Sequence, residues 1–82
     1  MRSLIIAYDL NNEVRRPPIV DEVRKSPGYA RLSESSYVIS TDETVRQVYD
    51  RFDPLIDKDD DFFVLTVTTP WIGYGPKRVM DW

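Results

Sequence analysis

The side chains that could do chemistry in this chain are carboxylates, hydroxyls and basic groups, because its 82 residues include neither histidine nor cysteine. This composition excludes histidine-based triads, thiol nucleophiles and zinc–thiolate centres. The sequence also has no glycine-rich loop of the kind that holds phosphates. Any catalysis must therefore use carboxylates, tyrosine, serine, lysine, or an Mg²⁺ or Mn²⁺ ion bound by carboxylates.

Asp9 is the first candidate, because it follows Tyr8 at the end of an otherwise apolar segment, residues 3–10. The end of a strand is a place where a sheet can present a metal ligand, and a twofold dimer would bring two such carboxylates near its axis. The alternative is a structural aspartate that accepts hydrogen bonds from the backbone of the turn at Asn11 and Asn12. Composition alone favours this alternative, and both interpretations stay open.

The acidic run 57–61 resembles the first half of a calcium-binding loop. Such a loop then requires glycine at its sixth position and glutamate at its twelfth, where this chain has Phe62 and Thr68. We therefore interpret the run as a solvated turn between a helix and a strand.

Two further groups are weaker candidates for function. Segment 33–36 contains three serines, but only Glu34 could act as a base nearby, which favours a turn. The aromatic residues Trp71, Tyr74 and Trp82 could stack on bases. We favour the view that they seal a core or an interface.

The elements that position these residues follow from the apolar patterns. Segments 3–10 and 62–68 are apolar on both faces and predict strands, with 3–10 in the middle of a sheet. Segments 29–32 and 36–40 predict a hairpin. One helix begins at Pro17, and a second begins at Thr41 or Asp42 and carries an apolar stripe to Ile56.

This order of elements predicts an α+β fold, a ferredoxin-like βαββαβ sandwich with a four-stranded antiparallel sheet and two helices on one face. We place this domain at residues 1–69 and an aromatic tail at 70–82. Two strands that are apolar on both faces need a cover on the side away from the helices. A second copy of the chain is the simplest cover, so we expect a homodimer with the tail at its interface.

Charge and hydropathy limit the binding partners and the cellular location that we expect for the protein. The net charge of −3 argues mildly against tight nucleic-acid binding, and we interpret the basic pairs 15–16, 24–25 and 77–78 as solvated positions. The apolar segments are too short for a signal peptide or a membrane span, which predicts a cytoplasmic protein with no membrane partner.

Three short motifs occur in order along the chain: Tyr-Asp-Leu-Asn at 8–11, a serine-rich stretch ending in Ser-Thr-Asp at 36–42, and Asp-Lys-Asp-Asp-Asp-Phe-Phe-Val at 57–64. Their order and spacing over about residues 1–75 resemble the Cas2 superfamily, and more narrowly the small Cas2-like proteins labelled SinR-like. Relatives of that superfamily include VapD-like ribonuclease toxins. The resemblance implies a ferredoxin-like homodimer.

In Cas2 proteins the aspartate that ends the first strand is the proposed Mg²⁺ ligand of a metal-dependent nuclease. The resemblance therefore implies Mg²⁺ as cofactor and Asp9 as both metal ligand and catalytic residue. It also implies a set of substrate-binding residues, namely Tyr8, Asn11, Arg31, Ser36 and Tyr37.

Two functions remain open at this point. One is a Mg²⁺-dependent endonuclease that acts on RNA or DNA. The other is a non-catalytic dimeric scaffold that binds a protein or a nucleic acid. The environment of Asp9 separates them, because a solvent-facing carboxylate favours the nuclease and a carboxylate occupied by backbone amides favours the scaffold.

Overall fold

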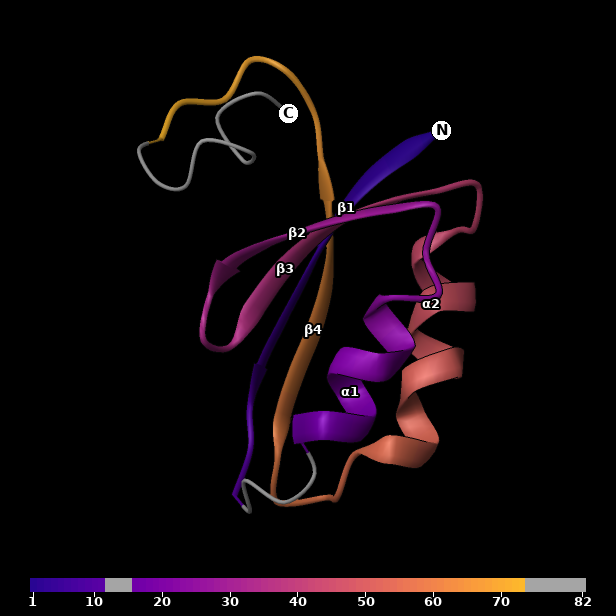
Figure 1. Cartoon of the computed structure of the whole chain (residues 1–82), viewed down its shortest axis with the longest axis vertical. Coiled ribbons are helices and arrows are strands. Elements are labelled where there is room, and N and C mark those ends of the chain that lie inside the picture. The colour runs from indigo at the N-terminus through magenta and orange to yellow at the C-terminus, as the bar shows by residue number, and fades with distance from the viewer. Residues whose placement is uncertain (12–15, 74–82) are drawn as a thin grey trace.

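The computed structural model describes residues 1–11 and 16–73, and its elements follow the predicted βαββαβ order (Figure 1). All strand pairs are antiparallel, and the sheet has the order β2-β3-β1-β4, so that β1 lies in the middle as predicted. Both helices lie on one face of the sheet. The predicted fold class is thereby confirmed. The elements are β1 (Arg2–Asp9), α1 (Arg16–Val23), β2 (Gly28–Ser33), β3 (Ser36–Thr41), α2 (Val45–Phe52), a 3₁₀ turn η2 (Asp53–Leu55) and β4 (Asp61–Val67).

The core lies between the sheet and the two helices. Alternate residues of β1 point into it, because successive side chains of a strand face opposite sides of the sheet. Each aliphatic side chain that is fully buried there contributes about 1.5–3 kcal/mol relative to exposure. The strands contribute Leu4, Ile6, Tyr8, Tyr37 and Ile39 to this core, and the helices contribute Ile19, Val23, Val48 and Phe52.

The other face of the sheet, which we call the open face, is also apolar. From β1, Ile5 and Ala7 are half-buried on this face, while Phe63 and Leu65 of β4 are 61% and 49% exposed. The two-sided apolar character predicted for these strands is therefore present. The homodimer expected to cover this face stays a prediction, as does the interface role of the tail, of which Tyr74 and Trp82 lie outside the described residues.

Helix α2 begins later than the sequence suggested. Its N-cap is Thr44, not Thr41 or Asp42, and it forms a reciprocal capping box with Gln47. The Gln47 N–H donates to Thr44 Oγ1 at 3.1 Å, and the Thr44 N–H donates to Gln47 Oε1 at 2.8 Å. Thr41 cannot cap the helix because it is the last residue of β3 and pairs with β1.

The far end of α2 shows the effect of a proline. Pro54 has no N–H to continue the helical hydrogen bonds, and the chain tightens at that point into the 3₁₀ turn η2. The apolar stripe nevertheless continues as predicted, since Leu55 and Ile56 pack against the core. The ring of Phe52 stacks on Phe62 of β4 at a centroid distance of 5.4 Å, which ties the helix to the sheet edge.

An ion-pair cluster joins the two helices. Arg51 of α2 donates to Glu22 of α1 at 2.6 Å and to Glu43 at 3.0 Å, and Lys25 also reaches Glu22 at 3.1 Å. Burial acts to raise the pKa of Glu22, but the hydrogen bonds from Arg51 and Lys25 outweigh it and lower that pKa below its ordinary value of 4.5. Among the described residues, no helix is long and apolar enough to cross a membrane.

Candidate functional site

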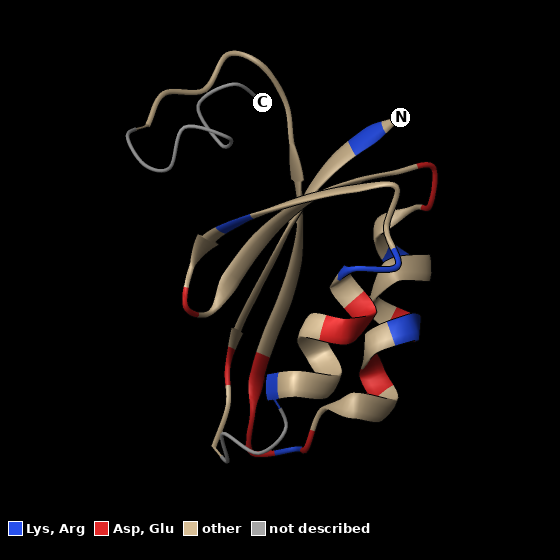
Figure 2. Ribbon diagram, in the orientation of Figure 1, with Lys and Arg blue, Asp and Glu red and all other residues tan. Residues whose placement is uncertain are grey.

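Two aspartates face each other at one end of the open face. Asp9 ends β1 and Asp61 begins β4, and the two are direct partners in the antiparallel register. Directly opposed residues in such a pair have Cβ atoms about 4.5–5.5 Å apart. Alternation places Asp9 on the same face as Ala7, and Asp61 on the same face as Phe63. Figure 2 shows these acidic strand ends side by side.

The Asp9 carboxylate faces solvent and is not occupied by the backbone. The Asn11 N–H, which the structural interpretation assigned to Asp9, donates instead to Asp60 Oδ1 at 2.7 Å. Within residues 1–11 and 16–73, neither Asp9 nor Asp61 has a side-chain hydrogen bond or ion pair. This is the environment that favours a ligand-binding carboxylate over a structural one.

A shallow pocket of about 390 Å³ contains this pair of carboxylates. Ser36, one of the predicted substrate-binding residues, lines it from the start of β3, and its hydroxyl lies 2.6 Å from that of Ser33. The pocket thus combines two carboxylates and serine hydroxyls with an apolar floor. Its lining residues are Ala7, Tyr8, Asp9, Ser35, Ser36, Asp61 and Phe63.

Of the other predicted substrate-binding residues, Tyr8 also lines this pocket, and the rest lie elsewhere. The side chain of Tyr8 is buried in the core, with its hydroxyl 3.4 Å from the Glu34 carbonyl oxygen. Asn11 is exposed, and its backbone is held by Asp60. Arg31 and Tyr37 are cross-strand partners that lie on the helix side of the sheet. The binding roles of these residues stay predictions.

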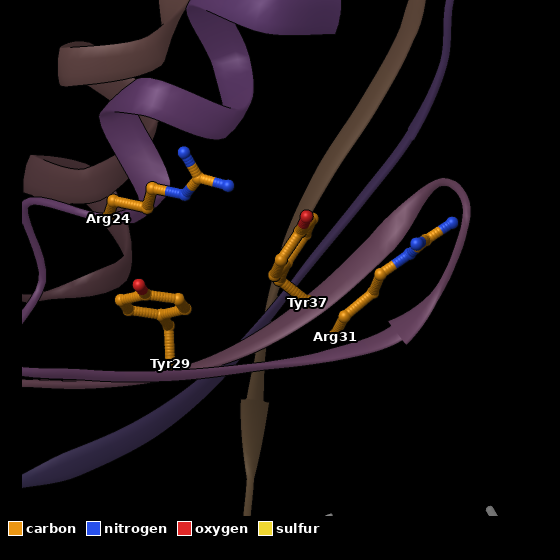
Figure 3. A pocket seen from close by; sticks show the side chains of 4 residues that line it. All are labelled: Arg24, Tyr29, Arg31 and Tyr37. Carbon is orange, nitrogen blue, oxygen red and sulfur yellow. The ribbon is translucent and has the colours of Figure 1, made fainter. Parts of the chain in front are cut away.

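Arg31 and Tyr37 line a second pocket, of about 300 Å³, together with Arg24 and Tyr29 (Figure 3). This pocket lies on the opposite face from Asp9, because Ser36 and Tyr37 are consecutive residues of one strand. Sequence reasoning missed Arg24 and Tyr29. Arg24 belongs to a basic pair that was interpreted as solvated, and Tyr29 was assigned only to a strand.

The residues of the acidic run 57–61 have two different places in the structure: Asp57 and Asp60 belong to a turn, and Asp61 lines the pocket. Asp60 accepts the Asp57 N–H at 2.9 Å as well as the Asn11 N–H, so its carboxylate holds the loop between η2 and β4. This agrees with the turn predicted for the run. Asp61 alone joins the pocket, and the sequence interpretation missed it, although a strand that runs antiparallel to β1 must begin where β1 ends.

The donor set of the pocket suits a small hard cation. Mg²⁺ is commonly held by one or two carboxylates together with water and phosphate oxygens, and Asp9 and Asp61 supply two carboxylates. Among the described residues no group of three or more possible metal-binding side chains occurs. One chain therefore offers a partial ligand set, which a phosphate or a second copy of the chain would complete.

No protein-family model and no curated protein sequence matches this chain. Among solved structures, it is similar to the crystal structure of a hypothetical protein, TT1823, from Thermus thermophilus. The TM-score is 0.72 and the sequence identity 23%, and the match covers 92% of this chain and 94% of the other. The similarity establishes the fold and nothing beyond it.

Proposed function

We propose that this protein is a Mg²⁺-dependent phosphodiesterase that cleaves RNA or DNA as a homodimer, with Asp9 as its central metal ligand. The observation that carries the proposal is the pair of exposed, directly opposed carboxylates, Asp9 and Asp61, which have no hydrogen-bonding partner in the described chain. The motif resemblance to Cas2 proteins supports the same residue independently.

Without a bound cation, the pair of carboxylates lowers the stability of the folded protein. Like charges directly opposite each other in a sheet are destabilising, by about 0.2–1 kcal/mol. A divalent cation between the two carboxylates would turn this repulsion into attraction. When bound, Mg²⁺ lowers the pKa of a coordinated water and polarises a phosphate oxygen. The Ser36 hydroxyl, in the same pocket, would orient a phosphate oxygen of the substrate.

The open face supports the dimeric part of the proposal. Phe63 and Leu65 are exposed on β4, the same strand that begins with Asp61. A twofold partner packed on this face would cover them and would bring its own Asp9 and Asp61 to the rim of the interface. Four carboxylates from two chains would then supplement the partial ligand set of one chain.

Cleavage of labelled single-stranded RNA and double-stranded DNA tests the proposal. Wild type, Asp9→Asn and Asp61→Asn are compared in Mg²⁺, in Mn²⁺ and in EDTA. Asp59→Asn serves as the matched control, because Asp59 is an exposed carboxylate of the neighbouring loop with no interaction in the described chain. We expect cleavage that requires the metal, disappears in Asp9→Asn, falls in Asp61→Asn and persists in Asp59→Asn.

The absence of cleavage by a correctly folded protein in both metals would reject the enzyme. Exposed Phe63 and Leu65 would then favour the second candidate, a non-catalytic scaffold that binds its partner through this apolar face. A protein that is dimeric, does not cleave and binds a partner whether or not Asp9 is replaced would establish that alternative.

A further inference from the structure

The pocket on the helix side of the sheet is polar and basic. The hairpin formed by β2 and β3 extends past the helices, which leaves part of this side uncovered (Figure 1). Arg24, which directly follows α1, and Tyr29 line one side of the pocket, and Tyr37 faces them. Arg31 lies beyond Tyr37, toward the tip of the hairpin (Figure 3).

Within residues 1–11 and 16–73, the two arginines of this pocket have no acidic partner. Among the described residues that line it, none is acidic. The Arg24 side chain makes no hydrogen bond or ion pair in the described chain, and Arg31 donates only its Nε–H to the Ser33 carbonyl at 3.1 Å. Both arginines of α2 have carboxylate partners, Arg46 with Asp50 and Arg51 with Glu22.

Unpaired arginines are notable in a chain whose net charge is −3. Carboxylates are abundant, yet the nearest one in sequence on α1, Glu22, is occupied by Arg51 and Lys25. Two guanidinium groups that have no counter-ion among the described residues favour an anionic ligand, and the planar guanidinium group matches the oxygens of a phosphate.

The tyrosines add a second kind of contact. Tyr29 is 45% exposed and offers a ring face, while Tyr37 is almost buried and has a hydroxyl with no hydrogen bond in the described chain. Aromatic rings beside basic groups are the features with which proteins hold single-stranded bases and their phosphates. A volume of about 300 Å³ is at the small end of ligand sites, which suits one nucleotide and not a duplex.

We propose that this pocket binds one nucleotide of a single-stranded nucleic acid. Arg24 and the tyrosine hydroxyls hold its phosphate, and the base stacks on Tyr29. Arg31 binds the next phosphate toward the tip of the hairpin. The inference rests on the proposed function for its choice of ligand, because Ser36 and Tyr37 place this pocket and the Asp9 pocket on opposite faces of the same strand end. A single-stranded nucleic acid that passes around the hairpin would reach both pockets.

Fluorescence anisotropy of a labelled single-stranded oligouridine tests the proposal in EDTA, where no metal-dependent cleavage occurs. We expect Arg24→Gln to weaken binding about tenfold and to reduce the salt dependence by about one counter-ion. Tyr29→Leu should weaken binding by about 5- to 100-fold through lost stacking. Arg46→Gln is the matched control: it removes the same charge from an exposed position on α2 and should leave affinity within about twofold.

If Arg24→Gln and Arg46→Gln weaken oligonucleotide binding equally, the effect is a general one of charge, and binding in this pocket is refuted. Equally tight binding of a duplex of the same sequence would overturn the single-stranded ligand. Competition with uridine monophosphate distinguishes two possible ligands, a nucleic-acid strand and a free mononucleotide. We expect it to displace the oligonucleotide only at much higher concentration, and tighter binding of the mononucleotide would overturn the choice of a strand.

The failure of this inference can be told from the failure of the proposed function. Asp9→Asn should retain binding in EDTA, because Asp9 lies on the opposite face of the sheet and no described residue of this pocket is a carboxylate. If cleavage depends on Asp9 but binding does not depend on Arg24, the proposed nucleotide pocket is rejected and the proposed nuclease is retained. If binding depends on Arg24 but the protein never cleaves, the proposed nuclease is rejected and the nucleotide pocket is retained.

Discussion

Replacing Asp9 with asparagine should stabilise the metal-free protein and remove its response to Mg²⁺. Asp9 and Asp61 are direct cross-strand partners, and neither has a stabilising partner among the described residues. Neutralising one of them removes a repulsion and breaks no hydrogen bond of the described chain. An asparagine has nearly the same shape, so the packing around Ala7 and Phe63 should not change.

The size of the effect can be estimated from the usual Cβ spacing of directly opposed residues. At that separation of about 5 Å, two unit charges in a solvated site repel each other by about 0.8 kcal/mol. At physiological salt, where the screening length is about 8 Å, roughly half of this remains. A gain of about 0.4–0.8 kcal/mol corresponds to about 2–6 °C in the melting temperature of a domain of this size.

Magnesium should reverse the order of stability. At about ten times its dissociation constant, a ligand that binds only the folded state stabilises it by about 1.4 kcal/mol. That gain exceeds the repulsion removed by Asp9→Asn. We therefore expect the variant to melt above wild type in EDTA and below wild type in saturating Mg²⁺.

Thermal unfolding followed by circular dichroism, at one fixed protein concentration, measures the stability of wild type and Asp9→Asn in EDTA and in Mg²⁺. Asp59→Asn is again the control and should follow wild type in both conditions. A variant less stable than wild type in EDTA would show that Asp9 makes a favourable interaction in the free protein. An equal Mg²⁺ response in wild type and Asp9→Asn would place the cation elsewhere. Either result would refute the reasoning.

Two further predictions concern the helices and the open face. Glu22→Gln should lower the free energy of unfolding by about 1–3 kcal/mol, because Arg51 loses one of its two charged partners and keeps only Glu43. Since folding lowers the pKa of Glu22, this contribution is fully present above the ordinary value of 4.5 and is lost as pH falls through the lowered value, which urea unfolding from neutral pH to about pH 3 would detect. A pH-independent difference would contradict it. Leu65→Glu should convert the proposed dimer to a monomer in sedimentation velocity, whereas Thr66→Glu, on the opposite face of β4, should not. A wild-type monomer at micromolar concentration would remove the dimer altogether.

The fold could be predicted because each element carries its own pattern. The double apolar alternation of residues 3–10 places β1 in the middle of the sheet, and the order of strands and helices leaves few packings. The start of α2 was harder, because Thr41, Asp42 and Thr44 all have side chains that can cap a helix. Pairing with β1 decides the matter by keeping Thr41 in β3, and that pairing is not visible in the local sequence.

The candidate site was predicted in part for the same reason. Asp9 was identified from its place at the end of an apolar segment. Its partner Asp61 was grouped with the acidic turn before it, because only the register between β1 and β4 separates Asp61 from Asp60. The binding role of Arg24 also depends on contacts between distant segments, which bring the end of α1 near the hairpin.

The strict alternation of β3 has a consequence for how this hairpin can change during evolution. Ile39 must stay in the core, and it fixes which face every residue between it and the turn occupies. Inserting or deleting one residue between Tyr37 and Ile39 would move Ser36 to the helix side and Tyr37 to the open face, exchanging these residues of the two pockets in one step. Point substitutions, by contrast, alter one pocket and leave the other intact. Functional relatives should therefore differ here by substitution, by changes of two residues, or by changes within the turn itself.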